Sequence, residues 1–293
     1  MIKGERQLSH SQNFLKSSGF VNSLIERTSI NSGDLVVEIG PGKGIITAEL
    51  AKKAGMVIGV EYDPNFARNL KARFSGYPNV EIVESDFLTW TLPNKPYKVL
   101  ANIPFNMTAD IVSKLLSGEN SPEATYLIMQ DKAAERFMGP PFGPNSQASI
   151  LLQPFYDMGI EAYIDSRKFE PVPQVSAVLA RFVKRLNPLI DPQLRQSYRD
   201  FVIYGFNQWQ PTILNSFRKI FTGKQLAVLA KNLGLDGRTP SQLSVDKWMG
   251  MFNSFIQYPP QERKDLVKGA EKRLRDREIG MQKQYRTRVG NYR

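Results

Sequence analysis

A glycine-rich turn between a short apolar segment and a helical pattern constrains the fold of this chain more than any other feature. The apolar segment is Leu35-Val-Val-Glu-Ile39, the turn Gly40-Pro-Gly-Lys-Gly44 follows at once, and residues 45–54 have helical periodicity. Glycine allows a tight turn and a close approach of the backbone to a ligand, which a Cβ atom would obstruct. The turn therefore predicts a βα unit with a ligand site at the carboxyl end of its strand.

The same alternation of apolar segments and helical patterns continues through the first 135 residues. Strands are predicted over 35–39, 56–60, 80–83, 99–101 and 126–129, and helices over 45–54, 65–74 and 109–116. Residues 155–164 and 175–183 have no helix between them and are expected to form an antiparallel pair that closes the sheet. This pattern indicates an α/β fold with a Rossmann-like, mostly parallel sheet. The loops after residues 39, 60, 83 and 101 are expected to line its ligand site.

The second part of the chain is predicted to be helical. Helical patterns cover residues 193–206, 213–221, 224–233 and 245–256, with short polar, Gly or Pro breaks between them. Residues 261–293 are charged and poor in large apolar side chains, which is typical of a solvated helix or a disordered arm. We therefore expect three parts: an α/β domain over 1–185, a small all-helical domain over 186–260, and a basic C-terminal arm over 261–293.

The net charge of +11 is concentrated in the second part. Residues 1–185 carry 20 basic and 19 acidic side chains, whereas residues 186–293 carry 19 basic and 9 acidic ones. This distribution indicates a catalytic domain joined to a domain that binds a polyanion such as RNA. The alternative is an excess of basic side chains on the surface that only increases solubility.

The scarcity of two residue types excludes several classes of chemistry. The chain has no Cys and one His, His10, so disulfides, thiolate metal centres, Cys nucleophiles and two-His metal sites are excluded. No metal is expected, and a Ser-His-Asp triad would have to use His10. No apolar run is long enough to span a membrane and residues 1–13 are polar, so we expect no membrane association, no signal peptide and a cytoplasmic location.

Acidic residues follow the predicted strands in a pattern that favours a nucleoside cofactor. Glu38 precedes the first glycine, and Glu61 ends the next strand, where a carboxylate can accept both ribose hydroxyls. Asp86, after the third strand, can accept a hydrogen bond from an adenine amine. The spacing G-x-G-x-G together with Glu38 favours S-adenosylmethionine, which is cationic and lacks phosphate, over a dinucleotide. The alternative to a cofactor site is an ordinary βα turn with solvated acidic side chains. Five neighbouring residues are assigned to the same site: Gly40, Gly42, Gly44, Tyr62 and Phe87.

The segment Asn102-Ile-Pro-Phe105 ends the next strand and suits methylation of an exocyclic amine. Asn102 Oδ1 and the Ile103 carbonyl can accept the two hydrogens of that amine, and Pro104 holds the backbone that aims the carbonyl. The ring of Phe105 can stack on a flipped base. The alternative is a turn with a buried Phe.

Two further segments are candidates for the same site. Phe169, at the start of Phe169-Glu-Pro-Val-Pro173, could lie beside the target base because the prolines stiffen the loop; a rigid connector with Phe169 in the core is the alternative. Gln12, Asn13 and Phe14 could close over the methionine end of the cofactor, or could form a polar cap.

Jointly, these motifs resemble those of the ribosomal RNA adenine N6-methyltransferases. The motifs Ser11-Gln-Asn-Phe-Leu15, Glu38–Gly44, Glu61, Ser85-Asp-Phe87, Asn102–Phe105 and Phe169-x-Pro-x-Pro173 occur in that family's order over residues 9–257. The resemblance implies S-adenosylmethionine as methyl donor and Asn102 and Phe105 as target-base residues. It also implies that Gln12, Gly40, Glu61, Asp86 and Asn102 contact the cofactor.

The resemblance extends to one branch of that family. Asn102-Ile-Pro-Phe105, Leu179-Ala-Arg-Phe182 and Tyr198-Arg-Asp-Phe201 look like the erythromycin-resistance branch. That branch implies methylation of N6 of a flipped adenine in 23S rRNA, which confers resistance to macrolide-type antibiotics. We expect the protein to be a monomer. Asn106-Met-Thr108 departs from the usual pattern of the branch, which leaves mono- or dimethylation open.

Several other functions remain as alternatives. A housekeeping small-subunit rRNA adenine dimethyltransferase has the same chemistry, and a DNA adenine methyltransferase shares the amine step. A catalytically idle RNA-binding factor would keep the fold, although the intact Asn102–Phe105 segment and glycine turn argue against it. A nicotinamide oxidoreductase is the weakest option because of the glycine spacing.

Overall fold

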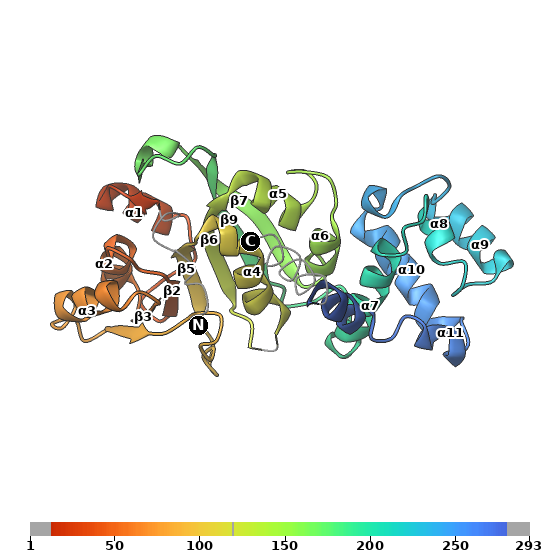
Figure 1. Ribbon diagram of the computed structural model, residues 1–293, viewed down its shortest axis with the longest axis horizontal. Coiled ribbons are helices and arrows are strands. Elements are labelled where there is room, and N and C mark those ends of the chain that lie inside the picture. Colours follow the sequence, from red (N-terminus) through yellow and green to blue (C-terminus); the bar gives the residue numbers. More distant parts are fainter. Residues whose placement is uncertain (1–12, 119, 280–293) are drawn as a thin grey trace, which may run out of the picture. The chain divides into compact units, whose positions relative to one another are not determined.

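The computed structural model describes residues 13–118 and 120–279, which divide into two compact units (Figure 1). The first unit comprises residues 13–135 and 156–186, and the second comprises residues 136–155 and 187–279. Gln12 and His10 lie outside the described residues, as do residues 280–293 of the predicted basic arm. In the part of the chain that is described, no helix is both long and apolar enough to cross a membrane.

The first unit is built on a seven-stranded sheet with the strand order β4-β3-β2-β5-β6-β9-β7. The strands are β2 Leu35–Ile39, β3 Met56–Glu61, β4 Val80–Glu84, β5 Lys98–Asn102, β6 Ala124–Gln130, β7 Tyr156–Ile164 and β9 Ala177–Lys184. The first five strands in the sheet order are parallel, and β9 pairs antiparallel with both β6 and β7. The α/β fold, each predicted strand and the antiparallel closing pair are thus confirmed.

Helices cover the sheet and bury both of its faces. They are α1 Ser18–Ile25, α2 Ile45–Lys53, α3 Pro64–Arg73, α4 Thr108–Ser117 and α5 Asp131–Met138. All five residues of β2 are buried, as expected for a parallel strand covered on both sides. On one face, Val36 and Leu100 pack in a core with Leu24 of α1 and Leu50 of α2. Figure 1 shows α2 and α3 beside β2 and β3.

The order of the strands reverses between β2 and β5. After β2 the chain continues to β3 and β4 on one side, whereas β5 and β6 lie on the other side. The loops that leave the carboxyl ends of β2 and β5 therefore diverge, and the space between them is where open α/β sheets bind ligands. The two strongest sequence motifs, Gly40–Gly44 and Asn102–Phe105, follow these two strands directly.

A second, two-stranded sheet was not predicted from the sequence. Phe14–Leu15 (β1) pairs antiparallel with Phe169–Glu170 (β8), so that Leu15 lies opposite Phe169. Strands of two residues carry no readable alternation, and their partners are about 150 residues apart in the chain. This pairing fixes the N-terminal segment against the connection between β7 and β9.

The second unit is helical and has an aromatic core. Its helices are α6 Gln147–Leu152, α7 Arg195–Phe206, α8 Ile213–Ser216, α9 Gly223–Leu233, α10 Val245–Gln257, α11 Gln261–Asp265 and the helical residues 270–279. Phe201 lies at the centre, stacked on Phe217 with ring centroids 4.5 Å apart and edge-on to Trp248 at 6.0 Å. Such aromatic pairs stabilise a small core beyond the area that they bury.

The segment 136–155 belongs to this helical unit, although the sequence placed it in the first domain. The Tyr198 hydroxyl donates to the Ile150 carbonyl at 3.0 Å, and Asn145 Nδ2 donates to the Leu243 carbonyl at 2.8 Å. Both bonds are buried and join residues about 50 or 100 positions apart, which no local pattern indicates. The other predicted boundary, at residue 185, is one residue from the division at Leu186.

Residues 261–279, which the sequence assigned to a separate arm, form part of the helical unit. The buried carboxylate of Asp200 accepts hydrogen bonds from the backbone N–H groups of Gly269 and Glu271, at 2.8 and 2.9 Å. Arg199 pairs with Glu271 through two hydrogen bonds of 2.6 and 3.0 Å, which lower the pKa of Glu271 to about 2. Asp200 thus caps the helix over residues 270–279 and ties it to α7.

Candidate active site

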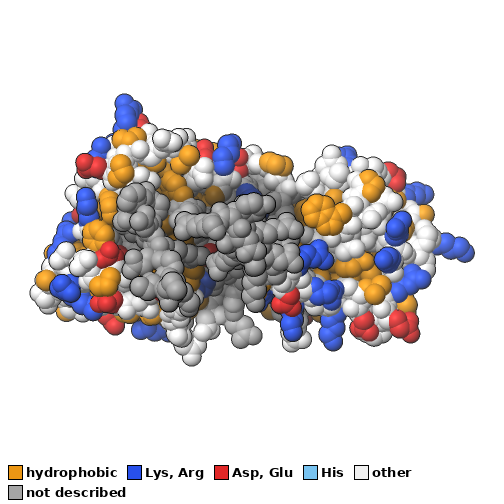
Figure 2. All heavy atoms as spheres, in the orientation of Figure 1, with side chains coloured by type: hydrophobic (Ala, Val, Ile, Leu, Met, Phe, Trp, Pro, Cys, Tyr) orange, Lys and Arg blue, Asp and Glu red, His pale blue; other side chains and the backbone are white. Residues whose placement is uncertain are grey.

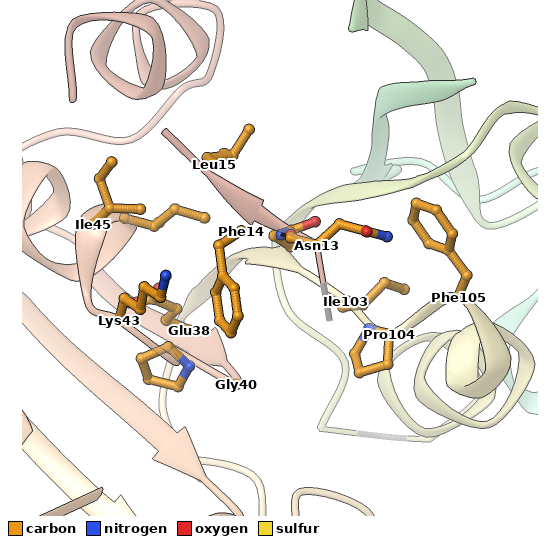
Figure 3. A pocket seen from close by; sticks show the side chains of 13 residues that line it. Asn13, Phe14, Leu15, Glu38, Gly40, Lys43, Ile45, Ile103, Pro104 and Phe105 are labelled. Atoms are coloured by element: carbon orange, nitrogen blue, oxygen red, sulfur yellow. Dashed lines mark hydrogen bonds between the residues drawn. The ribbon is translucent and has the colours of Figure 1, made fainter. Parts of the chain in front are cut away.

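A cleft opens at the carboxyl edge of the sheet, where β2 and β5 separate (Figure 3). It encloses about 590 Å³, open solvent at its mouth included. The lining residues come from the N-terminal segment, the glycine turn and the turn after β5: Asn13, Phe14, Leu15, Glu38, Gly40, Pro41, Lys43, Ile45, Ile46, Asn102, Ile103, Pro104 and Phe105.

The glycine turn has a backbone conformation that residues with a side chain rarely adopt. Gly40, Gly42 and Gly44 have φ angles of 62°, 54° and 74°, in the left-handed region. A Cβ atom on Gly44 would lie 2.6 Å from Leu70 Cδ2, and one on Gly42 would lie 2.6 Å from Phe14 Cε1. The turn therefore packs against α3 on one side and the Phe14 ring on the other. Of the three glycines, Gly40 lines the cleft.

Glu38 places a buried carboxyl group in the wall of the cleft. It is 1% exposed, and burial raises its pKa to about 8. The Thr47 hydroxyl, which donates to Glu38 Oε2 at 2.6 Å, opposes this rise, and the charge of Glu61 adds to it. A cation or a hydrogen-bond donor bound in the cleft would therefore lower the pKa of the Glu38 carboxyl group and favour its charged form.

Glu61 organises the glycine turn from the next strand. Its side chain is buried, with Oε2 accepting from the Gly42 N–H at 2.9 Å and Oε1 from the Asp63 N–H at 2.9 Å. Each carboxylate oxygen keeps a further lone pair for a ligand. Glu61 touches the turn but does not itself line the cleft.

The residues after β4 lie beside Glu61 along the same edge. The Ser85 N–H donates to the Glu61 carbonyl at 2.9 Å, which holds the two strand ends together. Asp86 Oδ1 accepts from the Leu88 N–H at 2.8 Å, and Phe87 is buried with Lys114 Nζ 5.3 Å from its ring. Tyr62, by contrast, is 58% exposed. Of the predicted cofactor residues, Gly42, Gly44, Glu61, Tyr62, Asp86 and Phe87 are absent from the lining of the cleft.

The turn after β5 presents two hydrogen-bond acceptors. Asn102 Nδ2 donates to the Asn13 carbonyl at 2.7 Å, which orients the amide, and the Ile103 N–H donates to the Ile128 carbonyl at 3.2 Å. Within residues 13–118 and 120–279, no donor reaches Asn102 Oδ1 or the carbonyl oxygen of Ile103. Two acceptors on adjacent residues are thus available to a ligand with two hydrogens.

Phe14 and Phe105 lie on different sides of the cleft. In Figure 3 the Phe14 ring lies between the glycine turn and Ile103–Pro104, and Phe105 lies beyond Pro104. Lys43 Nζ is 4.9 Å from the centroid of the Phe14 ring, a cation–π distance. Phe105 is partly exposed, as a stacking surface has to be.

The sequence did not indicate five of the lining residues: Leu15, Pro41, Lys43, Ile45 and Ile46. Lys43 lies within the glycine motif, and its position in the turn was the one available signal.

The placement of Phe169 corrects its assignment as a base-stacking residue. Its side chain is 0% exposed and packs in the core with residues of α1, because β8 pairs with β1 and turns the ring inward. It does not line the cleft. The alternative interpretation, a connector with Phe169 in the core, describes the structure.

Among the described residues there is no group of three or more His, Cys, Asp or Glu side chains that could hold a metal ion. The chemistry that this edge of the sheet supports comes from its carboxyl, amide, backbone carbonyl and aromatic groups.

Comparison with known proteins finds a match over residues 5–257 to the family described as ribosomal RNA adenine dimethylase. An rRNA adenine N-6-methyltransferase of Limosilactobacillus reuteri is 29% identical over 252 residues, which cover 86% of this chain and 97% of the relative. A ribosomal RNA small subunit methyltransferase A of Geobacter sulfurreducens is 30% identical over 218 residues, covering 71% of this chain and 78% of the relative. The crystal structure of the 23S rRNA methyltransferase ErmE matches with a TM-score of 0.75 at 27% identity, covering 84% of this chain and 100% of that chain.

Proposed function

The chain belongs to the ribosomal RNA adenine dimethylase family, and from that premise we propose that it methylates N6 of an unstacked adenine in 23S rRNA. Members of this family are S-adenosylmethionine-dependent rRNA adenine N6-methyltransferases. The observation that carries the proposal is the cleft at the strand-order reversal, which brings Asn102, Ile103 and Phe105 to the same space as Glu38 and the glycine turn.

The residues of this edge fit S-adenosylmethionine. Gly40 lines the cleft and a Cβ atom on it would have nothing within 4 Å, so the missing side chain leaves the backbone there open to a ligand. Glu38 offers a carboxyl group to a cationic ligand, and Glu61 can accept ribose hydroxyls with the lone pairs that its backbone contacts leave free. Asp86, at the adjacent strand end, is assigned to the adenine amine of the cofactor. When bound, the cofactor supplies an electrophilic methyl group on a sulfonium.

The chain's own contribution to the reaction is to position the amine of the target base. That amine is a poor nucleophile because its lone pair is delocalised into the ring. Asn102 Oδ1 and the Ile103 carbonyl oxygen each accept a hydrogen bond from one N–H of the amine. These two hydrogen bonds favour the tetrahedral geometry of the nitrogen that attack requires. The Asn13 carbonyl, by accepting from Asn102 Nδ2 at 2.7 Å, keeps the amide oxygen turned toward the substrate. Phe105 offers a ring on which the unstacked base can lie.

The choice of 23S rRNA rests on two observations. Asn102-Ile-Pro-Phe105 and Tyr198-Arg-Asp-Phe201 resemble the erythromycin-resistance branch, and ErmE, a 23S rRNA methyltransferase, matches over most of both chains. Methylation at the drug-binding region of 23S rRNA would confer resistance to macrolide-type antibiotics. The small-subunit alternative is favoured by the Geobacter sulfurreducens relative, which is similarly identical to this chain.

Primer extension on rRNA from cells with and without the protein separates these two functions. A new stop in 23S rRNA, together with a rise in the macrolide concentration that inhibits growth, is the expected result. A stop near the end of small-subunit RNA, with unchanged drug sensitivity, would establish the alternative. Mass spectrometry of the modified nucleoside then gives the number of methyl groups.

The mechanism is tested by Asn102→Ala. We expect methyl transfer to rRNA to fall by at least ~100-fold, since one of two acceptors that orient the amine is lost. Binding of S-adenosylmethionine, measured by calorimetry, should weaken far less than methyl transfer, because Asn102 is one of several expected cofactor contacts and the carboxyl groups and the glycine turn are unchanged. Full activity of the variant in a tritiated-methyl assay would contradict the assignment.

A further inference from the structure

Trp209, on the helical unit, is exposed in a way that packing does not explain. Its side chain is 89% exposed, the largest exposed fraction among the aromatic residues that the structure describes. Its φ angle of 54° lies in the left-handed region, which is uncommon for a residue with a large side chain. Strained backbone of this kind is concentrated at active sites, ligand clamps and switch regions.

A cleft lies beside Trp209 within the same unit. It encloses about 540 Å³, open solvent included, and Phe206, Gln210 and Pro240 are among its lining residues. The Phe206 ring stacks on the buried Trp248, with centroids 5.2 Å apart and planes 9° from parallel. One wall of the cleft is therefore a fixed aromatic ring, while Gln210 supplies an amide that can hydrogen-bond the edge of a base.

The stretch of chain that lines this cleft is basic. Between Phe206, at the end of α7, and Val245, at the start of α10, the chain carries five Lys or Arg residues and one acidic residue, Asp236. Arg218 and Lys219 follow Ser216, which lines the cleft, and both are exposed. In Figure 2 blue side chains outnumber red ones on the visible surface of this unit.

Arg238 is brought to the same place by a backbone contact. The Ile213 N–H donates to the Arg238 carbonyl at 2.8 Å, and Pro240, two residues later, lines the cleft. Among the residues that the structure describes, no carboxylate lies within 4 Å of the side chains of Arg218, Lys219 or Arg238. Unpaired cations near an exposed aromatic ring suit a nucleic acid strand, because the cations can contact its phosphates and the ring can stack on its bases.

We infer that Trp209 and the cleft beside it form a stacking site for an unpaired base of the rRNA substrate, with Arg218, Lys219 and Arg238 contacting its phosphates. The inference rests on the proposed function, since it gives the helical unit a part in binding the same RNA. A base lies on the indole face, and the strand on either side follows the basic surface.

Fluorescence of the full-length chain titrated with oligouridylate tests the inference. Oligouridylate has little structure and contains no adenine, so it is not a substrate for N6 methylation. The three tryptophans are Trp90, Trp209 and Trp248, of which Trp209 is the exposed one. We expect quenching of its emission on binding, and loss of that quenching in Trp209→Phe, which keeps an aromatic face.

Four variants separate stacking from apolar contact. Trp209→Ala and Trp209→Leu should weaken binding by roughly 5- to 150-fold, the range that base–aromatic stacking provides, whereas Trp209→Phe should stay within a few-fold of the natural chain. Tyr258→Ala is the matched control, because Tyr258 is another exposed aromatic residue of the same unit and does not line the cleft. With rRNA as substrate, Trp209→Ala should raise KM and leave kcat unchanged.

Three results would overturn the inference. They are unchanged Trp209 emission at saturating oligouridylate, an equal loss of affinity in Tyr258→Ala, and wild-type affinity in Trp209→Leu. In the last case an apolar partner, such as a ribosomal protein, would explain the exposed side chain better. If the protein methylates neither 23S nor small-subunit rRNA, the proposed function is refuted. The oligouridylate measurement does not depend on methylation, so it still tests the stacking site.

Discussion

Replacing the buried Glu38 by Gln is expected to remove a pH-dependent part of the free energy of unfolding. Glu38 is 1% exposed, and burial raises its pKa to about 8 although the Thr47 hydroxyl donates a hydrogen bond to it. Gln has nearly the same shape, can accept the same hydrogen bond and does not titrate. Comparing the two chains across pH therefore isolates the ionisation of this side chain.

The size and sign of the effect follow from the two pKa values. Between the ordinary value of 4.5 and the folded value of about 8, the folded chain keeps a proton that the unfolded chain releases. Stability from this group is therefore complete below pH 4.5 and is lost as the pH rises toward 8. Each pKa unit corresponds to about 1.4 kcal/mol, so the loss amounts to about 5 kcal/mol at most.

Guanidinium denaturation of both chains at intervals from pH 5 to pH 9 measures the effect. The natural chain should lose stability relative to Glu38→Gln as the pH rises. Thr47→Val should extend the loss to higher pH, since it removes the hydrogen bond that favours the charged form. Saturating S-adenosylmethionine, which is a cation, should reduce the loss. A difference between the natural chain and Glu38→Gln that does not change with pH would refute the reasoning.

Three further predictions concern packing and charge. Phe105→Ala should lose methyl transfer and cost less stability than Phe169→Ala, because Phe105 is only partly buried against the core. Phe169→Ala should lose about 3–5 kcal/mol of stability, because its ring lies inside the core. Equal denaturant midpoints for the two variants would contradict this placement. Gly44→Ala should cost at least ~1–2 kcal/mol, since φ is 74° and the added Cβ would meet Leu70, and a chain as stable as the natural one would show that the turn can relax. Truncation after residue 279 removes four basic residues and should flatten the plot of log K for RNA against log salt by ~0.7–0.9 per lost phosphate contact. Truncation after residue 260 should also lower the melting temperature, because it leaves Asp200 and Arg199 without their partners; unchanged salt dependence in both would show that the tail does not contact RNA.

The placement of the site could be predicted from the sequence because its main parts are local. The apolar segments before Gly40 and Asn102 are short enough to be buried strands, and a glycine turn or an amide immediately after such a strand lies at its carboxyl end. The contact between Asn13 and Asn102 was beyond prediction, since it joins residues 89 positions apart through a backbone carbonyl.

Phe169 shows where local interpretation failed. An aromatic residue before two prolines has the composition of a binding loop, and nothing in the adjacent sequence distinguishes a ring that faces a substrate from one that faces the core. The pairing of β8 with β1 decides this, and neither strand is long enough to show alternation.

The sequence by itself determined the order of the βα units, the glycine turn, the turn after β5 and the excess of positive charge behind residue 185, because each depends on neighbours within a few positions. Only the tertiary structure decided that Phe14 packs on Gly42, that Phe169 is buried, that residues 136–155 and 261–279 belong to the helical unit, and that Trp209 is exposed. The physical reason is the same in each case. These features depend on pairings between distant segments, and such pairings leave no periodic pattern in the chain.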